Sequence, residues 1–297
     1  MSLKNLINLA ENLLADPLKM FSTSGFNNKE YLLSIESSTI KLGLERTIKL
    51  MNFCGNPQQG LPVIQVAGTN GKGSTSAMIA KILECAGYKV GLSTSPHLVN
   101  VNERIRVNGN PINDEMLALF IEKYKLGIEM FSASFFETIT AMAFWFFKEK
   151  NVDIAVMETG LGGRLDSVTI CNPILTVITP ISLDHTEILG DSIKKIAYEK
   201  AGIMKKGVPC VISKQENQAY SVLNKSASKL NCDLIISTNT YSQIKPALMG
   251  KYQYENACLA YLLLKLTNYI FQMNSLRTVL KKPSGMVEIK FYKNLLM

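Results

Sequence analysis

The chain has 297 residues, of which 47% are hydrophobic and 19% are charged, so it can bury a core and does not have the composition of a disordered protein. Its formal net charge of +8 favours anionic partners such as nucleotides, but the lysines are scattered, which argues against a nucleic-acid-binding protein. The six cysteines form no C-x-x-C pair, which argues against a zinc site or a disulfide framework and indicates a reducing compartment.

The first segment, MSLKNLINLAENLL (residues 1–14), mixes polar residues among its leucines and predicts an amphipathic helix, not a signal peptide. No apolar run approaches the roughly 18 residues that a membrane span needs. We therefore expect a cytoplasmic protein with no membrane partner.

From residue 63 onward, short apolar runs alternate with helical patterns. This alternation is typical of an α/β fold, in which helices cover both faces of a mostly parallel sheet. The Asn-Gly pair in RVNGN (Arg106–Asn110) predicts a tight hairpin turn. The predicted strands are Val63–Ala67, Lys89–Ser93, Asp153–Glu158, Ile174–Thr179, Pro209–Ser213 and Asp233–Ile236, and the predicted helices are Ser74–Ala86, Phe136–Lys148, Ser192–Met204, Ala219–Leu230 and Gln253–Tyr269.

The first predicted strand runs into a glycine-rich loop, VIQVAGTNGKGSTS. A strict phosphate loop reads G-x-x-x-x-G-K-[ST], but here Val66 takes the place of the first glycine and Gly73 follows the lysine. The glycines still let backbone N–H groups point into one concavity, Lys72 adds a positive charge, and Ser74 opens a helix whose dipole favours an anion. A strand–turn–helix connection without a ligand is the alternative interpretation.

Six segments together resemble one family. AGTNGKGST, TSPHL, NERIRVNG, ETGLGGRLDS, SLDHTEILG and EKAGI have the order and approximate spacing found in folylpolyglutamate synthase and dihydrofolate synthase, members of the Mur ligase superfamily. They extend over residues 67 to 203, and the preceding LGLERTIKLMNFCGNPQ is similar to the family's lead-in helix. The resemblance implies a P-loop-type central ATPase domain, and the relaxed loop spacing is the form that these ligases use.

The resemblance also implies an activity. The family uses ATP and Mg²⁺ to phosphorylate a carboxylate of a folate or dihydropteroate, and the amino group of L-glutamate then attacks the acyl phosphate to give an amide. Phosphorylation converts a poor electrophile into one with a good leaving group, so the protein mainly positions anionic reactants and neutralises their charge. The expected partners are these small molecules alone, with no nucleic acid and no membrane, and we expect a monomer.

Each matching residue carries an implied role. Taken alone, Glu158 reads as a solvated acid at a strand end, His185 as a structural histidine and Lys200 as a surface lysine; only the motifs reverse these interpretations. Lys200 matches a lysine that is carbamylated in many family members. The implied catalytic residues are Lys72, His185 and Lys200, the residues around ATP are Gly71, Lys72, Gly73, Ser74 and Asn256, and the magnesium site comprises Ser74, Ser95, Glu158 and His185.

Two further segments, SFFE and LDS, match stretches of the family that contact the pterin-bearing substrate. The two phenylalanines of SFFE would otherwise belong to the core, because TITAMAFWFF directly after them has a buried-helix pattern. The implied substrate-binding residues are Phe135, Phe136, Glu137, Leu165, Asp166 and Ser167.

The match weakens toward the end of the chain. In GKYQYENACLA, Tyr252 replaces a family histidine, and in PSGMVE, Met286 stands where the family has an arginine that reaches the phosphates. Methionine cannot donate to a phosphate. The sequence therefore predicts an N-terminal and central ATP-binding domain over residues 1–270, and a short remnant or linker over 271–297 in place of the family's C-terminal glutamate ligase domain.

Two other functions remain open at this point. If the family's phosphate-binding arginine and C-terminal ligase domain are essential for catalysis, the chain would be an inactive remnant that binds a nucleotide or a pterin. An unrelated P-loop kinase or GTPase is disfavoured, because no hydroxyl directly follows Lys72 and no guanine-reading N-K-x-D is present.

Overall fold

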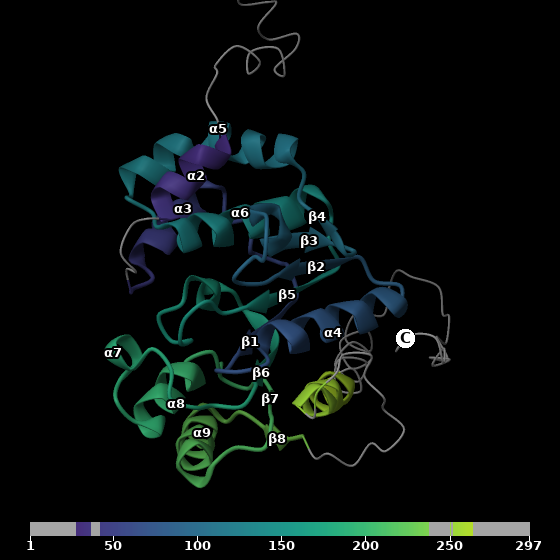
Figure 1. Cartoon of the computed structure of the whole chain (residues 1–297), viewed down its shortest axis with the longest axis vertical. Helices are drawn as coiled ribbons and strands as arrows, with labels where there is room; N and C mark the ends of the chain where they lie inside the picture. Colours follow the sequence, from purple (N-terminus) through teal and green to yellow (C-terminus); the bar gives the residue numbers. More distant parts are fainter. Residues whose placement is uncertain (1–27, 37–41, 238–249, 251, 264–297) are drawn as a thin grey trace, which may run out of the picture.

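The computed structural model describes residues 28–36, 42–237, 250 and 252–263 (Figure 1). The predicted helix over residues 1–14, the end of the helix predicted for Gln253–Tyr269, the boundary at residue 270 and the PSGMVE segment lie outside these ranges.

The described strands form one eight-stranded sheet in the order β4-β3-β2-β5-β1-β6-β7-β8. Only the pairs β2–β3 and β3–β4 at one edge are antiparallel. The predicted fold class, a mostly parallel sheet with helices, is confirmed. The strands are β1 (Val63–Ala67), β2 (Val90–Ser93), β3 (Ile105–Val107), β4 (Asn110–Pro111), β5 (Ile154–Glu158), β6 (Pro173–Ile178), β7 (Cys210–Ile212) and β8 (Leu234–Ile236).

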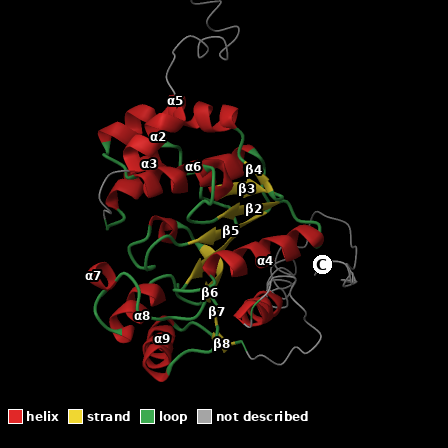
Figure 2. Ribbon diagram, in the orientation of Figure 1, coloured by secondary structure: helices red, strands yellow, loops and turns green. Residues whose placement is uncertain are grey.

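The described helices surround this sheet (Figure 2). They are α2 (Asn28–Glu36), α3 (Glu45–Phe53), α4 (Lys72–Cys85), α5 (Asp114–Met130), α6 (Phe135–Glu149), α7 (Thr186–Leu189), α8 (Ile193–Ala201), α9 (Asn217–Leu230), a helix of residues 252–263, and the short 3₁₀ turns η2 (Val101–Arg104) and η3 (Ser167–Ile170).

Side chains of the central strand alternate between the two faces of the sheet. Val63 belongs to a core cluster with α3, α5 and α6, and Ala67 belongs to a cluster with α8 and α9. Ile64 and Val66 pack instead against α4 and the helix of residues 252–263. Because successive residues of a strand point to opposite faces, these clusters place helices on both sides of the sheet, as the continuous apolar strands predict.

The helices differ from the prediction mainly at their ends and in number. Helix α4 begins at Lys72, two residues before the predicted start at Ser74, and α8 ends at Ala201 where the pattern predicts Met204. The sequence patterns above do not predict α2 or α5. Helix α5 nevertheless buries apolar side chains at helical spacing and has Asn113 as its N-cap, with the Asn113 side chain accepting from the N–H of Met116.

The RVNGN hairpin is confirmed. Strands β3 and β4 pair antiparallel with Val107 opposite Asn110, and between them Asn108 (φ 47°) and Gly109 (φ 76°) have left-handed backbones. Two such residues in succession are what a tight type I′ hairpin turn requires. None of the helices in the described ranges is long and apolar enough to cross a membrane.

Candidate active site

The candidate site lies where the parallel strands β1, β2, β5 and β6 end. The carboxyl ends of such strands meet at one edge of a sheet, where open α/β folds bind their ligands. The glycine loop follows β1 and leads into α4, and Gly71 has a left-handed backbone (φ 83°) at the N-cap of α4. Lys72 and Gly73 therefore lie in the first turn of the helix, whose N–H groups have no partner within the helix and can face an anion.

The glycine loop is tied to the loop after β6. The N–H groups of Thr69 and Asn70 both donate to the carbonyl of Pro180, at 3.0 and 3.3 Å. The Thr69 hydroxyl donates to the carbonyl of Ser182 at 3.1 Å. The Lys72 ammonium donates to the carbonyl of Thr69 at 3.2 Å. These contacts fix the shape of the loop, and the described hydrogen bond of Lys72 lies within it.

Glu158 ends β5 and lies next to both the glycine loop and the TSPHL segment. Its Oε2 accepts from the N–H of Ser95 at 3.2 Å, and a Cβ added to Gly73 would lie 3.5 Å from the same oxygen. Glu158 is only 3% exposed, and burial raises the pKa of its carboxyl group to about 7, although the nearby Lys72 charge opposes this rise. The structure therefore excludes the interpretation of Glu158 as a solvated strand-end acid.

These oxygen groups fit a magnesium ion. Mg²⁺ prefers oxygen ligands and usually binds one or two protein side chains together with waters and phosphates. The buried carboxylate of Glu158 lies beside Gly73, the residue that precedes Ser74 in the chain. It also accepts a hydrogen bond from the backbone N–H of Ser95. Within the described residues, no group of three or more His, Cys, Asp or Glu side chains could hold a metal ion, so a site built entirely from such side chains is absent from that part of the chain.

Lys200 is a buried lysine in the last turn of α8, not the surface lysine of the alternative interpretation. It is 2% exposed, and its ammonium donates to the carbonyl of Gly68 in the glycine loop at 2.6 Å. Burial, and next the positive charge of Lys72, lower its pKa to about 8, while Asp184 and Asp166 act in the opposite direction. The motif EKAGI therefore places an amine with a depressed pKa against the phosphate-binding loop.

His185 lies directly before α7 with a left-handed backbone (φ 46°). Its side chain is 51% exposed, and Nε2 lies 3.6 Å from Oδ1 of Asp184. The loop that carries it is the one bonded to Thr69 and Asn70, but the described contacts do not join the imidazole to Glu158 or Ser95. The proposed metal set is thus assembled only in part.

The helix of residues 252–263 borders the glycine loop, as the ENA segment predicts. A Cβ added to Gly71 would lie 2.5 Å from Oδ1 of Asn256. The Asn256 amide donates to Gln253 at 3.1 Å, and the Gln253 amide reaches the Ser74 hydroxyl at 3.4 Å. Tyr252, which replaces the family histidine, is 63% exposed.

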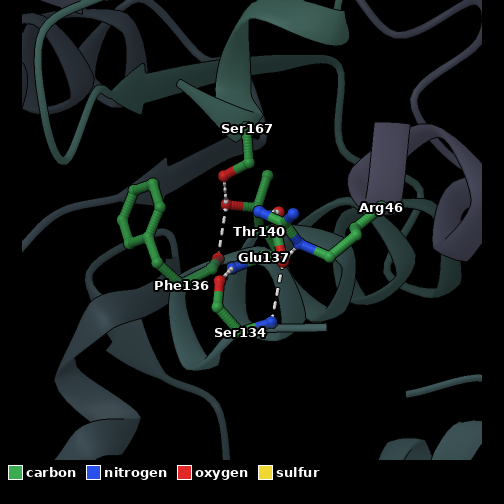
Figure 3. A network of polar contacts seen from close by, with 6 residues as sticks. All are labelled: Arg46, Ser134, Phe136, Glu137, Thr140 and Ser167. Carbon is green, nitrogen blue, oxygen red and sulfur yellow. Dashed lines mark hydrogen bonds and ion pairs between the residues drawn. The ribbon is translucent and has the colours of Figure 1, made fainter. Parts of the chain in front are cut away.

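The SFFE segment forms the first turn of α6, and Figure 3 shows its polar contacts. Glu137 and Ser134 form a capping box, and the Glu137 carboxylate pairs with Arg46. Phe135 is buried with the Arg104 guanidinium 4.9 Å from its ring centroid, whereas Phe136 is only half-buried. In this structure Glu137 and Phe135 therefore contact other parts of the protein, and Phe136 keeps an accessible surface.

The LDS segment shows a similar division. Asp166 is buried, and its two carboxylate oxygens accept from the N–H groups of Leu161 and Val168, both at 2.9 Å. Burial raises the pKa of Asp166 to about 6 against these hydrogen bonds. The Ser167 hydroxyl is 2.8 Å from that of Thr140, and Leu165 is half-buried. Of the six residues implied for substrate binding, Phe136 and Leu165 are thus the more accessible, while the other four are buried.

The loop that carries Asp166 packs directly on the end of α8. A Cβ added to Gly202 would overlap Arg164, and one added to Gly163 would lie 2.8 Å from the carbonyl of Glu199. Arg164 also pairs with Glu199 through its side chain, at 2.8 Å. The glycines of GLGGR and EKAGI therefore bring the Asp166 loop and the Lys200 helix into backbone contact.

We expect Gly202→Ala to destabilise the protein by about 1–3 kcal/mol. Gly202 has φ −63°, which alanine adopts freely, so the cost arises only from the collision with Arg164. Urea denaturation measures it, and Lys206→Ala, at an exposed position nearby, is the control. Equal stability of the two variants would contradict the close packing.

A pocket of about 500 Å³ opens beside the site, between α4 and the β2–β3 edge. Gly73, Ser95 and Glu158 line one end of it, and the charged residues further out are both basic, Lys81 and Arg106, and acidic, Glu84 and Glu103. The glycine loop and the buried carboxylate therefore border a space large enough for part of a ligand.

Comparison with known proteins agrees with this geometry. Residues 66–243 match the family model described as the Mur ligase middle domain. The chain belongs to the Mur ligase family. It is 39% identical over 253 residues to the dihydrofolate synthase/folylpolyglutamate synthase of Bacillus subtilis, covering 75% of this chain and 59% of that protein. It is 37% identical over 221 residues to the folylpolyglutamate synthase of Lacticaseibacillus casei, covering 71% of this chain and 52% of the relative.

This Mur ligase family member is also similar to solved structures of folylpolyglutamate synthases. An FPGS–AMPPCP–folate complex matches with a TM-score of 0.78 and 31% identity over 83% of this chain and 68% of that one. The folylpolyglutamate synthase of Thermotoga maritima matches with a TM-score of 0.72 and 35% identity over 80% of this chain and 61% of that one. The chain thus spans little more than half the length of the two curated relatives it matches.

The motifs do not predict three contacts in the candidate site of this Mur ligase family member. Gln253 reaches Ser74, Arg104 stacks on Phe135, and Asp184 acts on the pKa of Lys200. All three residues lie inside quoted segments, so the motifs contain the signal for their importance. Their partners follow only from the packing of distant segments.

Proposed function

We propose that the chain contributes an ATP-dependent ligation of L-glutamate to a folate or dihydropteroate carboxylate, through an acyl phosphate. The observation that carries this proposal is the junction at the end of β1, where Lys72, Glu158 and Lys200 surround one glycine loop. Relatives of the same family are named as folylpolyglutamate and dihydrofolate synthases, and one related complex contains AMPPCP and folate. Both support the assignment of ATP and a pterin-bearing acceptor.

The residues divide the chemistry as follows. Backbone N–H groups of the first turn of α4, with Gly71 and Gly73, donate to the ATP phosphates. Lys72 exchanges its hydrogen bond to Thr69 for one to a phosphate oxygen. The acceptor carboxylate attacks the terminal phosphorus, and ADP leaves. The neutral glutamate amine then attacks the acyl carbon, phosphate departs with the electrons of the broken C–O bond, and the amide nitrogen gives up one proton to solvent. Positioning and charge neutralisation supply most of the rate in such transfers.

Ser74, Glu158, Ser95 and His185 would hold Mg²⁺, which supplies neutralisation of the phosphate charge when bound. Asn256 would contact the nucleotide from the helix of residues 252–263, since it already lies against Gly71.

We assign Phe136 and Leu165 to direct contact with the pterin-bearing acceptor, because they are the accessible members of their segments. Phe135, Glu137, Asp166 and Ser167 would hold these two in place, since each is buried against the protein itself.

We propose that Lys200 acts as a carbamate. At a pKa of about 8, roughly one-tenth of the amine is neutral at pH 7 and can attack CO₂. The N–C bond forms, and one proton passes to solvent. The resulting anion replaces a cation beside Gly68 and supports the metal region. Isotope-labelled bicarbonate and carbon NMR should show a carbamate signal that is absent from Lys200→Met.

The six cysteines are all free thiols, which supports a cytosolic location, and we propose a monomer with small-molecule partners only.

The decisive test supplies the purified protein with Mg·ATP, L-glutamate and either dihydropteroate or a tetrahydrofolate. We expect an amide product and one phosphate for each amide formed. ATP binding without a glutamate-dependent product from either acceptor would reject ligation by this chain and favour a nucleotide- or pterin-binding role.

A further inference from the structure

An ion pair joins α3 to the first turn of α6 across 91 residues of sequence. Nε of Arg46 donates to Oε2 of Glu137 at 3.2 Å, and NH2 of Arg46 lies at an ion-pair distance of 3.1 Å from Oε1, which accepts no hydrogen bond from the described residues (Figure 3). The Glu137 side chain is 4% exposed, and that of Arg46 is 26% exposed. One charge-assisted hydrogen bond and one ion-pair contact thus hold the carboxylate against the guanidinium.

The same carboxylate caps α6. Its Oε2 accepts from the N–H of Ser134 at 2.7 Å, and the Ser134 hydroxyl accepts from the N–H of Glu137 at 3.4 Å. A buried carboxylate that loses its cation is strongly unfavourable, because it is neither solvated nor paired. The geometry of the capping box, and thus the start of α6, therefore depends on Arg46.

The first turn of α6 contacts both flanks of the candidate acceptor site. A Cβ added to Gly160 would lie 2.6 Å from Cζ of Phe136, so this ring presses on the loop that follows Glu158. The Thr140 hydroxyl donates to the carbonyl of Phe136 at 2.8 Å and lies 2.8 Å from the Ser167 hydroxyl. A shift of this turn would move the Phe136 ring and the LDS segment together.

We propose that Arg46 is a positioning residue for the pterin-bearing acceptor, acting through Glu137 on the Phe136 wall of the site. The inference rests on the proposed function and deepens it, since it assigns a residue of the lead-in helix α3 to acceptor affinity. The contacts of Arg46 described above are to Glu137 and not to the glycine loop, so we expect variants at Arg46 to keep their affinity for ATP.

The test measures dihydropteroate and ATP binding by fluorescence titration, together with steady-state kinetics, for matched variants. We expect Arg46→Met to weaken dihydropteroate binding and raise its KM about tenfold, while kcat at saturating acceptor and the Kd for ATP change less than about twofold. Arg46→Lys keeps the charge without the planar fork and should fall between wild type and Arg46→Met. Lys49→Met, at an exposed position of α3, is the control.

A double-mutant cycle separates positioning from direct contact. If Arg46 acts through Glu137, Arg46→Met with Glu137→Gln binds dihydropteroate no more weakly than Arg46→Met alone, because the unpaired buried charge is gone. Fully additive losses would overturn the inference, as would a lower melting temperature with unchanged acceptor affinity. Should Arg46→Met fail to fold, the comparison of Arg46→Lys with wild type decides by the same two readouts. Wild-type protein that binds ATP but neither acceptor rejects the proposed function itself, a result distinct from normal acceptor binding by the Arg46 variants.

Discussion

Lys200→Met should change how the stability of the protein depends on pH. The folded-state pKa of Lys200 is about 8, below the unfolded value of 10.5, because burial disfavours the cation. Below pH 8 both states hold the proton and the folded state carries the full penalty. Between pH 8 and 10.5 only the unfolded state holds the proton, so stability rises with pH, and above 10.5 the penalty is gone.

The measurement is urea denaturation of wild type and Lys200→Met at pH 7 and pH 9, in buffer freed of CO₂ and bicarbonate so that Lys200 is the amine and not the proposed carbamate. Relative to the variant, wild type should gain about 1.4 kcal/mol over this interval, one pKa unit of linkage. Lys194→Met removes an exposed lysine from the same helix and should run parallel to wild type. Parallel curves for wild type and Lys200→Met would show that the amine titrates normally.

We also expect Lys200→Met to lose turnover by on the order of 100-fold while still binding ATP.

Lys72→Met should abolish most nucleotide binding. Lys72 supplies the positive charge of the glycine loop, and its only described hydrogen bond is to the carbonyl of Thr69, so its removal takes away a phosphate partner without opening the core. We expect the Kd for ATP to rise on the order of 100-fold, equivalent to about 2.7 kcal/mol. Turnover should fall by at least the same factor.

Isothermal titration with Mg·ATP checks the first effect, and the amide-forming assay checks the second. Lys225→Met, on the exposed side of α9, removes the same charge away from the site and should bind ATP as wild type does. An unchanged ATP affinity of Lys72→Met would refute the assignment of the glycine loop as a phosphate site.

Much of the fold can be predicted from the sequence because its central strands are buried on both faces. Val63–Ala67 is predicted to the residue, since all five positions are buried and four of them are apolar, with Gln65 as the exception. The start of α4 is not predicted, because Lys72 and Gly73 have no apolar side chains and so add nothing to the helical spacing of apolar residues. Helix α5 is absent from the prediction. The sequence does contain its signals, namely the N-cap residue Asn113 and apolar residues at helical spacing, so this helix could have been predicted.

The motifs name residues of the candidate site but do not predict how these residues are arranged. The motifs single out Glu158 and Lys200, but their burial and raised or lowered pKa values follow from packing between distant segments. Conversely, the resemblance implies substrate contact for Glu137 and Asp166, but in the structure their carboxylates accept hydrogen bonds from the N–H groups of a helix cap and of a loop. A motif records which residues matter, and only the fold distinguishes a ligand contact from its support.

The helix of residues 252–263 also determines where the chain can be shortened. Its Leu259 and Leu263 lie in one core cluster with Ile79 and Leu83 of α4, and Asn256 lies against Gly71. A fragment that stops after β8 would expose the apolar face of α4 and remove one wall of the phosphate loop. The smallest piece that keeps a native glycine loop therefore extends at least to residue 263, well beyond the last strand of the sheet.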